Sequence, residues 1–335
     1  LWRHASPLPM NKARIVIVSP ALADANNGNW QTAHRWQKML SSRHSARIVG
    51  EWPDAAAKAD DVMLALHARR SGPSIDAWAE ARGPQGLAVV LTGTDLYRDI
   101  VDDATAQRSL QLAQRLVVLQ DMGPQALSTA MRNKTQVIFQ STTARSPSDK
   151  TPHHLRAVMV GHLRAEKDPL TLMAAAALLQ TGDGIFIDHI GAPLDASLGL
   201  AATATQQQHP HYRWLDAQPH EPTRRHIQRA HVLVHASRME GGAHVVMEAV
   251  CSSTPVIASR IPGNVGMLGT DYAGYFEPGD AAGLAALLRQ CRATQGARDG
   301  FLAHLSQQCA QRAPLFSPEN ERLSLLQLTE FLKAP

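Results

Sequence analysis

Short apolar runs alternate with stretches of helical periodicity along the first half of the chain. Residues 30–40, 75–81 and 105–114 place apolar side chains at helical spacing, and runs rich in Val, Ile and Leu lie around them. Five of these runs are predicted to be β-strands: residues 14–19, 62–66, 87–91, 116–119 and 136–139. A run without polar alternation is typical of a strand covered on both faces. The pattern therefore predicts a parallel sheet between two layers of helices.

The same alternation returns after a break. Residues 142–154 are polar, contain two prolines and follow neither period, which predicts a linker. Beyond it we predict strands at residues 157–160, 185–189, 232–235 and 256–259, and helices at residues 170–179, 198–207, 243–251 and 281–292. A repeated strand–helix alternation predicts two doubly wound α/β domains, in which each strand-to-helix loop lies at the carboxyl edge of its sheet.

The length of 335 residues also favours two domains. We predict an N-terminal domain over residues 10–150 and a C-terminal domain over residues 155–317. A last helix, at residues 318–333, follows without a new strand, and residues 318–335 are expected to pack back on the first domain. Met10 is expected to be the native start, with an extraneous leader of nine residues before it.

Composition narrows the function class. Hydrophobic residues at 44% and charged residues at 19% allow full cores, which excludes a disordered chain or a coiled coil. We expect no membrane segment, because no apolar run is long enough to span a bilayer. The net charge of +4 is spread without a basic run and aromatics are 5%, which argues against nucleic-acid binding. Three widely spaced cysteines disfavour a disulfide framework or structural zinc and indicate a cytoplasmic protein.

The segment from His235 to Ala249, HASRMEGGAHVVMEA, carries the richest chemistry. Gly241 and Gly242 form a loop that lets backbone approach a ligand, and a helix starts near the next residue, which favours an anion such as a diphosphate. Glu248 on that helix could accept hydrogen bonds from a ribose diol, and Glu240 from a second polyol. The alternative is a glycine loop with two solvated acids.

A second segment, VGHLRAEKDP, follows the first strand of the C-terminal domain. Asp168 suits an N-cap and Pro169 the first helical position, so Arg164 and Lys167 are expected near a helix N-terminus. In the usual doubly wound order the first and fourth strands flank the point where the winding reverses, and their loops meet there. Cations, helix N-termini and diol acceptors in one crevice predict a nucleotide diphosphate site. Taken alone, Lys167 would be a solvated surface lysine.

Together these segments resemble a known family. The Gly-x-Leu-x3-Lys stretch, the Glu-x7-Glu stretch and residues 255–259, PVIAS, are similar to the retaining GT-B glycosyltransferases of family 4. The resemblance implies two Rossmann-like domains facing across a cleft. It implies that Lys167 and an arginine hold the donor diphosphate, that Glu248 binds ribose and that Glu240 contacts the donor sugar. His162 stands where the family has its arginine, so that role passes to Arg164.

The chain resembles one subgroup more closely, nearly end to end from Arg14 to Phe316: the selenosugar synthases of selenoneine biosynthesis. The stretches that carry this resemblance are residues 27–29 (NGN), 66–71 (LHARRS), 92–99 (TGTDLYRD) and 240–243 (EGGA). The implied reaction joins selenophosphate to the anomeric carbon of UDP-N-acetylglucosamine or UDP-glucose, without a metal or another cofactor. From the residues alone, a helix start at Gly28 and the guanidinium of Arg69 suit a phosphate-like acceptor. The alternatives are a solvated Arg69–Arg70 pair and a core histidine at His67.

The predicted site therefore has three parts. The donor-binding set is Gly161, His162, Arg164, Lys167, Glu240, Gly241, Gly242, Ala243, His244 and Glu248. The acceptor-binding set is Asn27, Gly28, Asn29, His67, Arg69, Thr94 and Asp95. Catalytic roles are predicted for Glu240, Lys167 and His67. No metal ligand is predicted, because the chain has no Asp-x-Asp after a strand as metal-dependent GT-A enzymes do.

Other functions remain open on the same fold. A UDP-sugar 2-epimerase would use the donor pocket without an acceptor, and a family 4 enzyme with a hydroxyl acceptor would transfer sugar to an ordinary alcohol. A non-catalytic nucleotide-sugar sensor would bind UDP without turnover. A nicotinamide dehydrogenase is disfavoured, because no Gly-x-Gly-x-x-Gly follows the first strand of either domain. The predicted partners are UDP-sugar and selenophosphate, and the sequence leaves the oligomeric state open.

Overall fold

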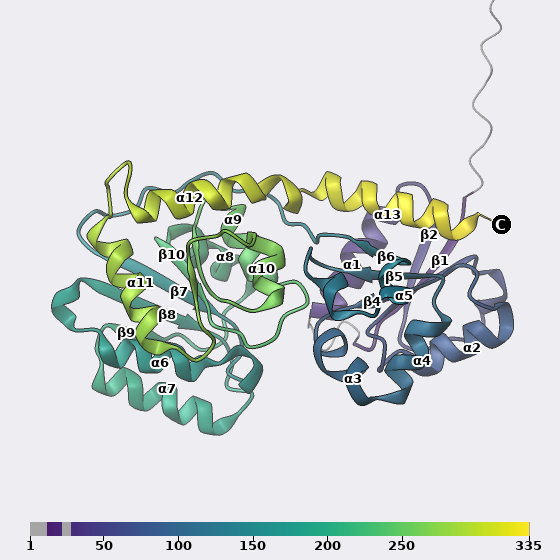
Figure 1. Ribbon diagram of the computed structural model, residues 1–335, viewed down its shortest axis with the longest axis horizontal. Helices are drawn as coiled ribbons and strands as arrows, with labels where there is room; N and C mark the ends of the chain where they lie inside the picture. Colours follow the sequence, from purple (N-terminus) through teal and green to yellow (C-terminus); the bar gives the residue numbers. More distant parts are fainter. Residues whose placement is uncertain (1–11, 22–27, 335) are drawn as a thin grey trace, which may run out of the picture. The chain divides into compact units, whose positions relative to one another are not determined.

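The computed structural model describes residues 12–21 and 28–334, and the chain divides into two compact units (Figure 1). The first unit runs to Val118 and includes Leu127–Ile138 and the chain from Arg322 onward. The second unit comprises Leu119–Ala126 and Phe139–Glu321. Among the described residues, no helix has the length and hydropathy needed to cross a membrane.

The first unit contains a parallel six-stranded sheet in the order β2-β1-β3-β4-β5-β6. Its strands are β1 (Arg14–Val18), β2 (Ser45–Val49), β3 (Val62–Leu66), β4 (Leu87–Leu91), β5 (Arg115–Val118) and β6 (Thr135–Val137). The five strands predicted for this half are confirmed. β2 was missed because it is an edge strand whose residues are half-buried or exposed, so its sequence, SARIV, has no continuous apolar run.

Helices cover this sheet. They are α1 (Gly28–Leu40), α2 (Gly72–Arg82), α3 (Ile100–Asp102), α4 (Ala104–Leu112), α5 (Thr129–Arg132) and most of α13 (Pro318–Lys333). Figure 1 shows α2 and α4 below the strands and α13 above them. The core joins apolar side chains of the central strands to Trp52 and Trp78, whose rings lie 5.1 Å apart.

The second unit repeats the design with a parallel sheet in the order β12-β11-β10-β7-β8-β9. Its strands are β7 (Leu155–Val160), β8 (Ile185–Ile190), β9 (Tyr212–Trp214), β10 (Val232–His235), β11 (Val256–Ser259) and β12 (Tyr275–Phe276). The four predicted strands are confirmed, whereas β9 and β12 were missed because each is a very short edge strand. β7 and β10 are neighbours, with Val232 opposite Ala157, as the doubly wound order predicts.

The second unit contains the helices α6 (Pro169–Leu178), α7 (Ala196–Gln208), α8 (His220–Arg229), α9 (His244–Val250), α10 (Pro262–Leu268), α11 (Ala281–Ala293) and α12 (Phe301–Arg312). The sequence pattern missed α8, α10 and α12.

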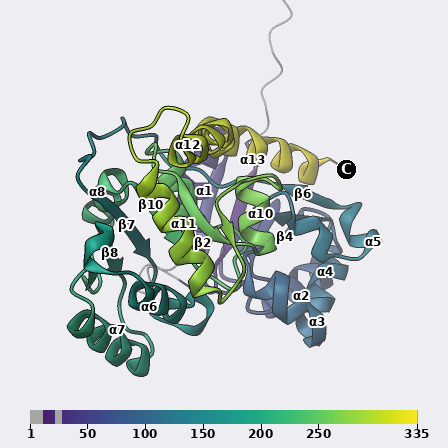
Figure 2. The ribbon, with the colours of Figure 1, turned by 60° about the vertical axis from the view of Figure 1, so that its left-hand side comes forward.

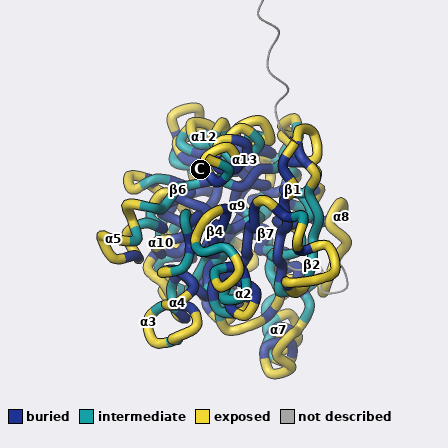
Figure 3. The backbone as a smooth tube through the Cα atoms, turned by 90° about the vertical axis from the view of Figure 1, so that its right-hand side faces the viewer, coloured by how far each residue is buried: buried dark blue, intermediate teal, exposed yellow. Residues whose placement is uncertain are grey.

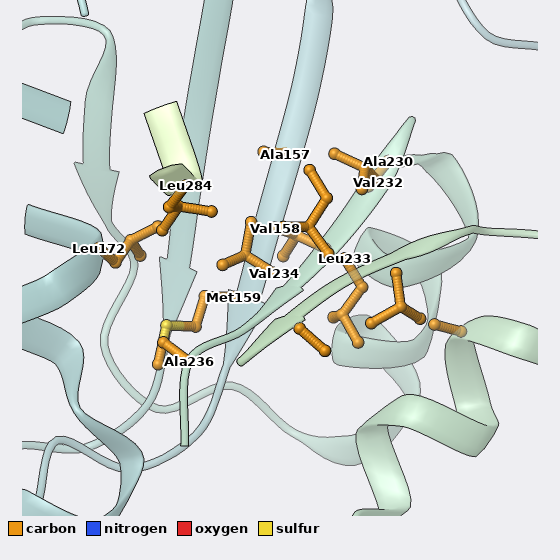
Figure 4. Close-up of a cluster of buried hydrophobic side chains, with 14 of the residues drawn as sticks. Ala157, Val158, Met159, Leu172, Ala230, Val232, Leu233, Val234, Ala236 and Leu284 are labelled. Atoms are coloured by element: carbon orange, nitrogen blue, oxygen red, sulfur yellow. The ribbon is translucent and has the colours of Figure 1, made fainter. Parts of the chain in front are cut away.

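Figure 2 shows α6 between α7 and α11. In Figure 4, Leu172 of α6 and Leu284 of α11 lie among the side chains of β7 and β10. Most of the central strands are buried and dark blue in Figure 3, whereas the edge strand β2 is intermediate or exposed.

The unit boundaries differ from the predicted domain boundaries of 10–150 and 155–317. Residues 142–150 have no helix or strand, as expected of a linker, yet they belong to the second unit. The side chain of Arg224 donates to Thr142 Oγ1 at 2.7 Å, and Arg145 N donates to Cys251 O at 2.8 Å. The helix predicted at residues 318–333 is α13, and its residues from Arg322 belong to the first unit. There Arg115 stacks on the Phe331 ring, 3.8 Å from its centroid.

Candidate functional site

The loops after β7 and β10 meet at the carboxyl edge of the second sheet. Lys167 Nζ lies 2.5 Å from Glu240 Oε1, which joins the two predicted segments by an ion pair. Arg238 strengthens the junction, since its backbone N donates to Glu166 O at 2.8 Å and its guanidinium lies 2.9 Å from Asp168 Oδ2. The structure therefore brings together the lysine and the glutamate that sequence reasoning placed in one crevice.

Glu240 is the most strongly perturbed carboxylate of this junction. Its side chain is only 12% exposed, and that of Lys167 is 17% exposed. Burial opposes ionisation of Glu240, but the charge of Lys167 and its hydrogen bond outweigh it, so the pKa of Glu240 lies well below its usual value. Glu240 is therefore an anion near neutral pH. It is paired with Lys167, a side chain for which a bound anion could compete.

His235 is a second partner of Glu240 that the sequence did not single out as functional. It ends β10, is buried, and its Nε2 lies 3.5 Å from Glu240 Oε1. Asn264 fixes the ring, because its Nδ2 donates to Ser259 O at 2.9 Å, so its Oδ1 accepts from His235 Nδ1 at 2.9 Å. The only sequence signal for this pair was a histidine at the end of a predicted strand.

Two glycines let the Glu240 loop pack closely. A Cβ on Gly263 would lie 2.2 Å from Glu240 O, and a Cβ on Gly242 would lie 2.9 Å from Leu119 Cβ. Either side chain would displace backbone or a neighbouring residue. α9 begins at His244, one residue after the predicted start, and Ala243 N donates to Met267 Sδ at 3.1 Å. The glycines therefore serve close packing of the loop.

Glu248 lies on α9 and is buried, with its side chain 7% exposed. His220, the first residue of α8, covers it, with Nε2 2.7 Å from Glu248 Oε1. The buried Arg224 Nε lies 3.9 Å from the same oxygen, while its terminal nitrogens bond Thr142 Oγ1 and Thr143 O. The hydrogen bond to Glu248 raises the pKa of His220, and burial opposes the rise. Sequence reasoning missed His220, whose signal was a helix start after Pro219.

The remaining donor-set residues surround the Lys167 loop. His162 is exposed, its Nδ1 accepts from Ala192 N at 3.1 Å, and burial together with Arg164 and Lys167 lowers its pKa. Arg164 is exposed, and a Cβ on Gly161 would contact Lys167 Cδ at 3.4 Å.

α6 begins at Pro169 as predicted, and Asp168 occupies its N-cap position. Asp168 has a φ of 49° in the left-handed region, and its carboxylate accepts from Thr171 Oγ1 at 2.8 Å rather than from a helix N–H.

A second cluster lies at the carboxyl edge of the first sheet, after β3 and β4. His67 is buried with a φ of 73°. Its Nδ1 accepts from Arg70 N at 3.3 Å, so in the neutral imidazole Nε2 carries the proton and donates to Thr94 Oγ1 at 3.2 Å. Burial lowers the pKa of His67, with Asp95 and Asp99 opposing the shift. His67 is therefore a hydrogen-bond donor at neutral pH.

Asp95 ties the two loops of this cluster together. It is fully buried, and its carboxylate accepts from Ala68 N at 2.9 Å, Thr92 N at 2.9 Å and Gly93 N at 3.0 Å. These bonds order the π-helical turn Asp95–Asp99 against the loop after β3. The structure thus gives Asp95 a positioning role, and direct contact with an acceptor stays a prediction.

Asp99 completes the cluster and was missed by sequence reasoning. Its Oδ2 accepts from Arg69 Nε at 2.9 Å, and its Oδ1 accepts from Arg98 Nε at 3.1 Å. Burial opposes ionisation, but the two arginines hold the pKa of Asp99 below its usual value. The only indication of Asp99 in the sequence was its position four residues after Asp95 and next to Arg98. Two guanidinium groups therefore face one carboxylate, and the negative charge of Asp99 is fully compensated.

Gly28 and Asn29 begin α1, as predicted, and Gly28 is exposed. Asn27 lies outside the described residues. Among the described residues, no group of three or more His, Cys, Asp or Glu side chains is arranged to hold a metal ion.

Sequence comparison gives a family for the second unit. Residues 140–301 match the family model described as Glycosyl transferases group 1. This stretch holds β7, β10 and the loops that carry Lys167, Glu240 and Glu248. The second unit is therefore similar to the glycosyl transferases group 1 family over these residues. No curated protein matches the sequence.

Solved glycosyltransferase structures share the fold. Sucrose-phosphate synthase from Thermosynechococcus elongatus superposes with a TM-score of 0.76 at 16% identity, over 96% of this chain and 99% of that one. HepE from Anabaena, solved with UDP and glucose, gives 0.67 at 16% identity over the same shares. A TarM mutant from S. aureus, solved with UDP and alpha-GlcNAc-glycerol, gives 0.62 at 12% identity over 80% of this chain and 55% of that one, so the chain spans about half of TarM. The predicted α/β fold of the GT-B type is confirmed.

Proposed function

We propose that this chain is a metal-independent glycosyltransferase that joins the anomeric carbon of a UDP-sugar to the selenium of selenophosphate. The donor would be UDP-N-acetylglucosamine or UDP-glucose, bound on the second unit. The acceptor would bind at the His67–Arg69 cluster of the first unit. The family match over residues 140–301 supports sugar transfer.

The donor assignment rests on the Lys167–Glu240 junction. When a diphosphate binds, Lys167 exchanges Glu240 for phosphate oxygens, and the released carboxylate accepts from hydroxyls of the sugar. Glu248 accepts from the ribose hydroxyls, and the cation of Lys167 offsets the charge that builds on the leaving diphosphate. HepE and TarM were each solved with UDP, which supports a uridine nucleotide as the leaving group.

The acceptor assignment rests on one observation: the three groups of the first-unit cluster that could act as a base already accept hydrogen bonds from the protein. His67 Nδ1 accepts a backbone N–H, Asp95 accepts three, and Asp99 accepts two arginines. A hydroxyl acceptor needs a group that takes its proton, whereas an anionic acceptor needs donors and positive charge. The guanidinium of Arg69, which is 40% exposed and uses only its Nε on Asp99, supplies both to a phosphate group.

Selenophosphate matches that demand, because it arrives as an anion with a soft, nucleophilic selenium. A lone pair on selenium forms the C–Se bond as the bond between the anomeric carbon and the diphosphate oxygen breaks. UDP leaves with that electron pair. No proton has to be removed from the nucleophile, so the engaged state of His67 is no obstacle to the reaction.

Turnover with defined substrates tests this function. UDP release from each UDP-sugar is measured with selenophosphate, with inorganic phosphate and with no acceptor, and the product mass is determined. We expect UDP release that depends on selenophosphate, with a product that contains selenium. A rearranged nucleotide sugar without transfer would indicate the 2-epimerase, and transfer to an alcohol alone would indicate a hydroxyl-acceptor enzyme. Binding of UDP without turnover would indicate a sensor.

A further inference from the structure

Glu248 is held by a residue that is itself exposed. The side chain of His220 is 74% exposed, and its Nε2 reaches 2.7 Å from Oε1 of a carboxylate that is 7% exposed. The two residues come from different elements, since His220 begins α8 and Glu248 lies on α9. Among the described residues no hydrogen bond reaches Glu248 Oε2. Oε1 of Glu248 is therefore fixed by His220, and Oε2 can still accept hydrogen bonds from a ligand.

Other cations do not replace His220 at this carboxylate. Arg224 Nε lies 3.9 Å from Oε1, which is too long for a hydrogen bond. Its terminal nitrogens donate to Thr142 and Thr143, so its orientation is set by that segment. The charged groups around His220 are Glu248 of α9 and Glu221 and Arg224 of α8, and Glu221 is itself paired with Arg145.

We propose that His220 is a positioning residue for the nucleotide, which orients Glu248 so that its carboxylate accepts from the ribose diol and selects ribonucleotides over 2′-deoxyribonucleotides. This inference rests on the proposed binding of a UDP-sugar at Glu248. A carboxylate fixed at one oxygen loses less freedom on binding a diol than one that rotates, so His220 strengthens the ribose contacts in particular. Contacts to the diphosphate do not depend on it.

The state of His220 gives the proposal a pH signature. Its pKa is raised by the hydrogen bond to Glu248, against the opposing effect of burial. The charge-assisted bond is present below that pKa and weakens as pH rises through it. Preference for UDP over 2′-deoxy-UDP should therefore be largest at acidic pH and narrow toward alkaline pH. Both ligands carry the same diphosphate, so the effect of its titration on binding cancels in the ratio of the two affinities.

The test is calorimetry of UDP and 2′-deoxy-UDP with wild type, His220→Ala, His220→Gln, Glu248→Ala and the matched control His226→Ala. His226 is on the same helix, and no polar contact of its side chain is found in the described residues. For wild type and His226→Ala we expect a preference for UDP of about tenfold or more. His220→Ala should lower that preference about threefold to tenfold and leave 2′-deoxy-UDP affinity unchanged. His220→Gln, which keeps an N–H donor, should restore part of it without the pH dependence.

The outcomes separate this inference from the function beneath it. If wild type prefers UDP, Glu248→Ala abolishes the preference and His220→Ala keeps it, the role of His220 is overturned and the donor site stands. Tighter binding of UDP to His220→Ala would also overturn it, because His220 would then compete with the ribose. If wild type binds neither nucleotide, or Glu248→Ala changes nothing, the donor assignment falls and His220 with it.

Discussion

The two sheets carry clusters of charge at their carboxyl edges, but the clusters hold their carboxylates differently. In the second unit, Glu240 is held by Lys167 at 2.5 Å and Glu248 by His220 at 2.7 Å, each through a side chain. In the first unit, Asp95 accepts three backbone N–H groups. A side-chain partner can be exchanged for a ligand, whereas backbone partners cannot leave without loss of the loop. The carboxylates of the second unit are therefore suited to exchange. In the first unit Asp99 is also held by side chains, but Asp95 gives its loops a constant shape.

The largest expected effect is at Asp95. Replacing it with Ala would leave three donors without their acceptor in a buried loop, so we expect Asp95→Ala to cost about 3–5 kcal/mol of unfolding free energy. Asp95→Asn keeps one carbonyl oxygen and should cost less. Denaturant unfolding of both variants measures this. A loss below about 1 kcal/mol in Asp95→Ala would show that the backbone bonds do not order the first-unit loops.

Lys167 should affect catalysis more than binding. We expect Lys167→Ala to lower kcat about a hundredfold while the UDP-sugar KM changes much less, because the lysine acts on charge that develops in the transition state. Arg238→Ala, which removes the neighbouring ion pair with Asp168, is the matched control. Steady-state kinetics of both variants decide between these roles. A raised KM with unchanged kcat would mean that Lys167 binds ground state and transition state equally.

Arg69 should affect the acceptor alone. Its Nε is occupied by Asp99, and we propose that the rest of its guanidinium binds the phosphate group. Arg69→Ala should raise the KM for selenophosphate about tenfold and leave UDP affinity nearly unchanged. The neighbouring exposed Arg70 supplies the control, Arg70→Ala. Added salt should raise the acceptor KM further through screening. Equal damage to donor and acceptor constants would remove Arg69 from the acceptor site.

The smallest expected effects are on the pH dependence of Tm. They concern His67 and His220, whose pKa values are shifted in opposite directions. Burial lowers the pKa of His67 in the folded protein. The free energy of unfolding should therefore decrease as pH falls below about 6.5, where His67 of the unfolded chain binds a proton first. The bond to Glu248 raises the pKa of His220, so its contribution is present below about 6.5 and lost as pH rises through the raised value. Tm should thus fall in His220→Gln at acidic pH only, by about 1–3 °C.

His67→Gln should show the reverse pattern, with a smaller loss of Tm between neutral and acidic pH than wild type. Thermal unfolding of both variants across this pH range makes the comparison. Parallel pH curves for the two variants would contradict the assigned environments of the two histidines.

The sequence predicted every central strand of the two sheets, because apolar residues dominate both faces of these strands. β2, β9 and β12 were missed for the opposite reason, since edge strands are short or half exposed and lack that pattern. α8 was missed because its sequence, HEPTRRHIQR, is polar on most of its surface. Pattern and structure agree in the buried strands, whereas of the four edge strands only β6 was predicted.

The candidate site divides in the same way. Lys167, Glu240 and Glu248 could be predicted because they sit in local stretches that follow buried strands. Their partners could not, because these are brought in by tertiary contacts: His220 lies 28 residues from Glu248 and Asn264 lies 29 from His235. In the first unit the sequence placed Asp95 in the acceptor set, but not its three backbone donors or the neighbouring Asp99. Partners that are distant in the chain carry no local pattern.

The central claim is that this protein makes a carbon–selenium bond without a catalytic base. It is tested most directly by NMR of the product formed from a UDP-sugar labelled with ¹³C at the anomeric carbon and from ⁷⁷Se-labelled selenophosphate. We predict a one-bond coupling between ¹³C and ⁷⁷Se in the product, formed together with UDP. UDP release with the labelled carbon bonded to oxygen would contradict the claim, as would a labelled carbon that stays attached to UDP.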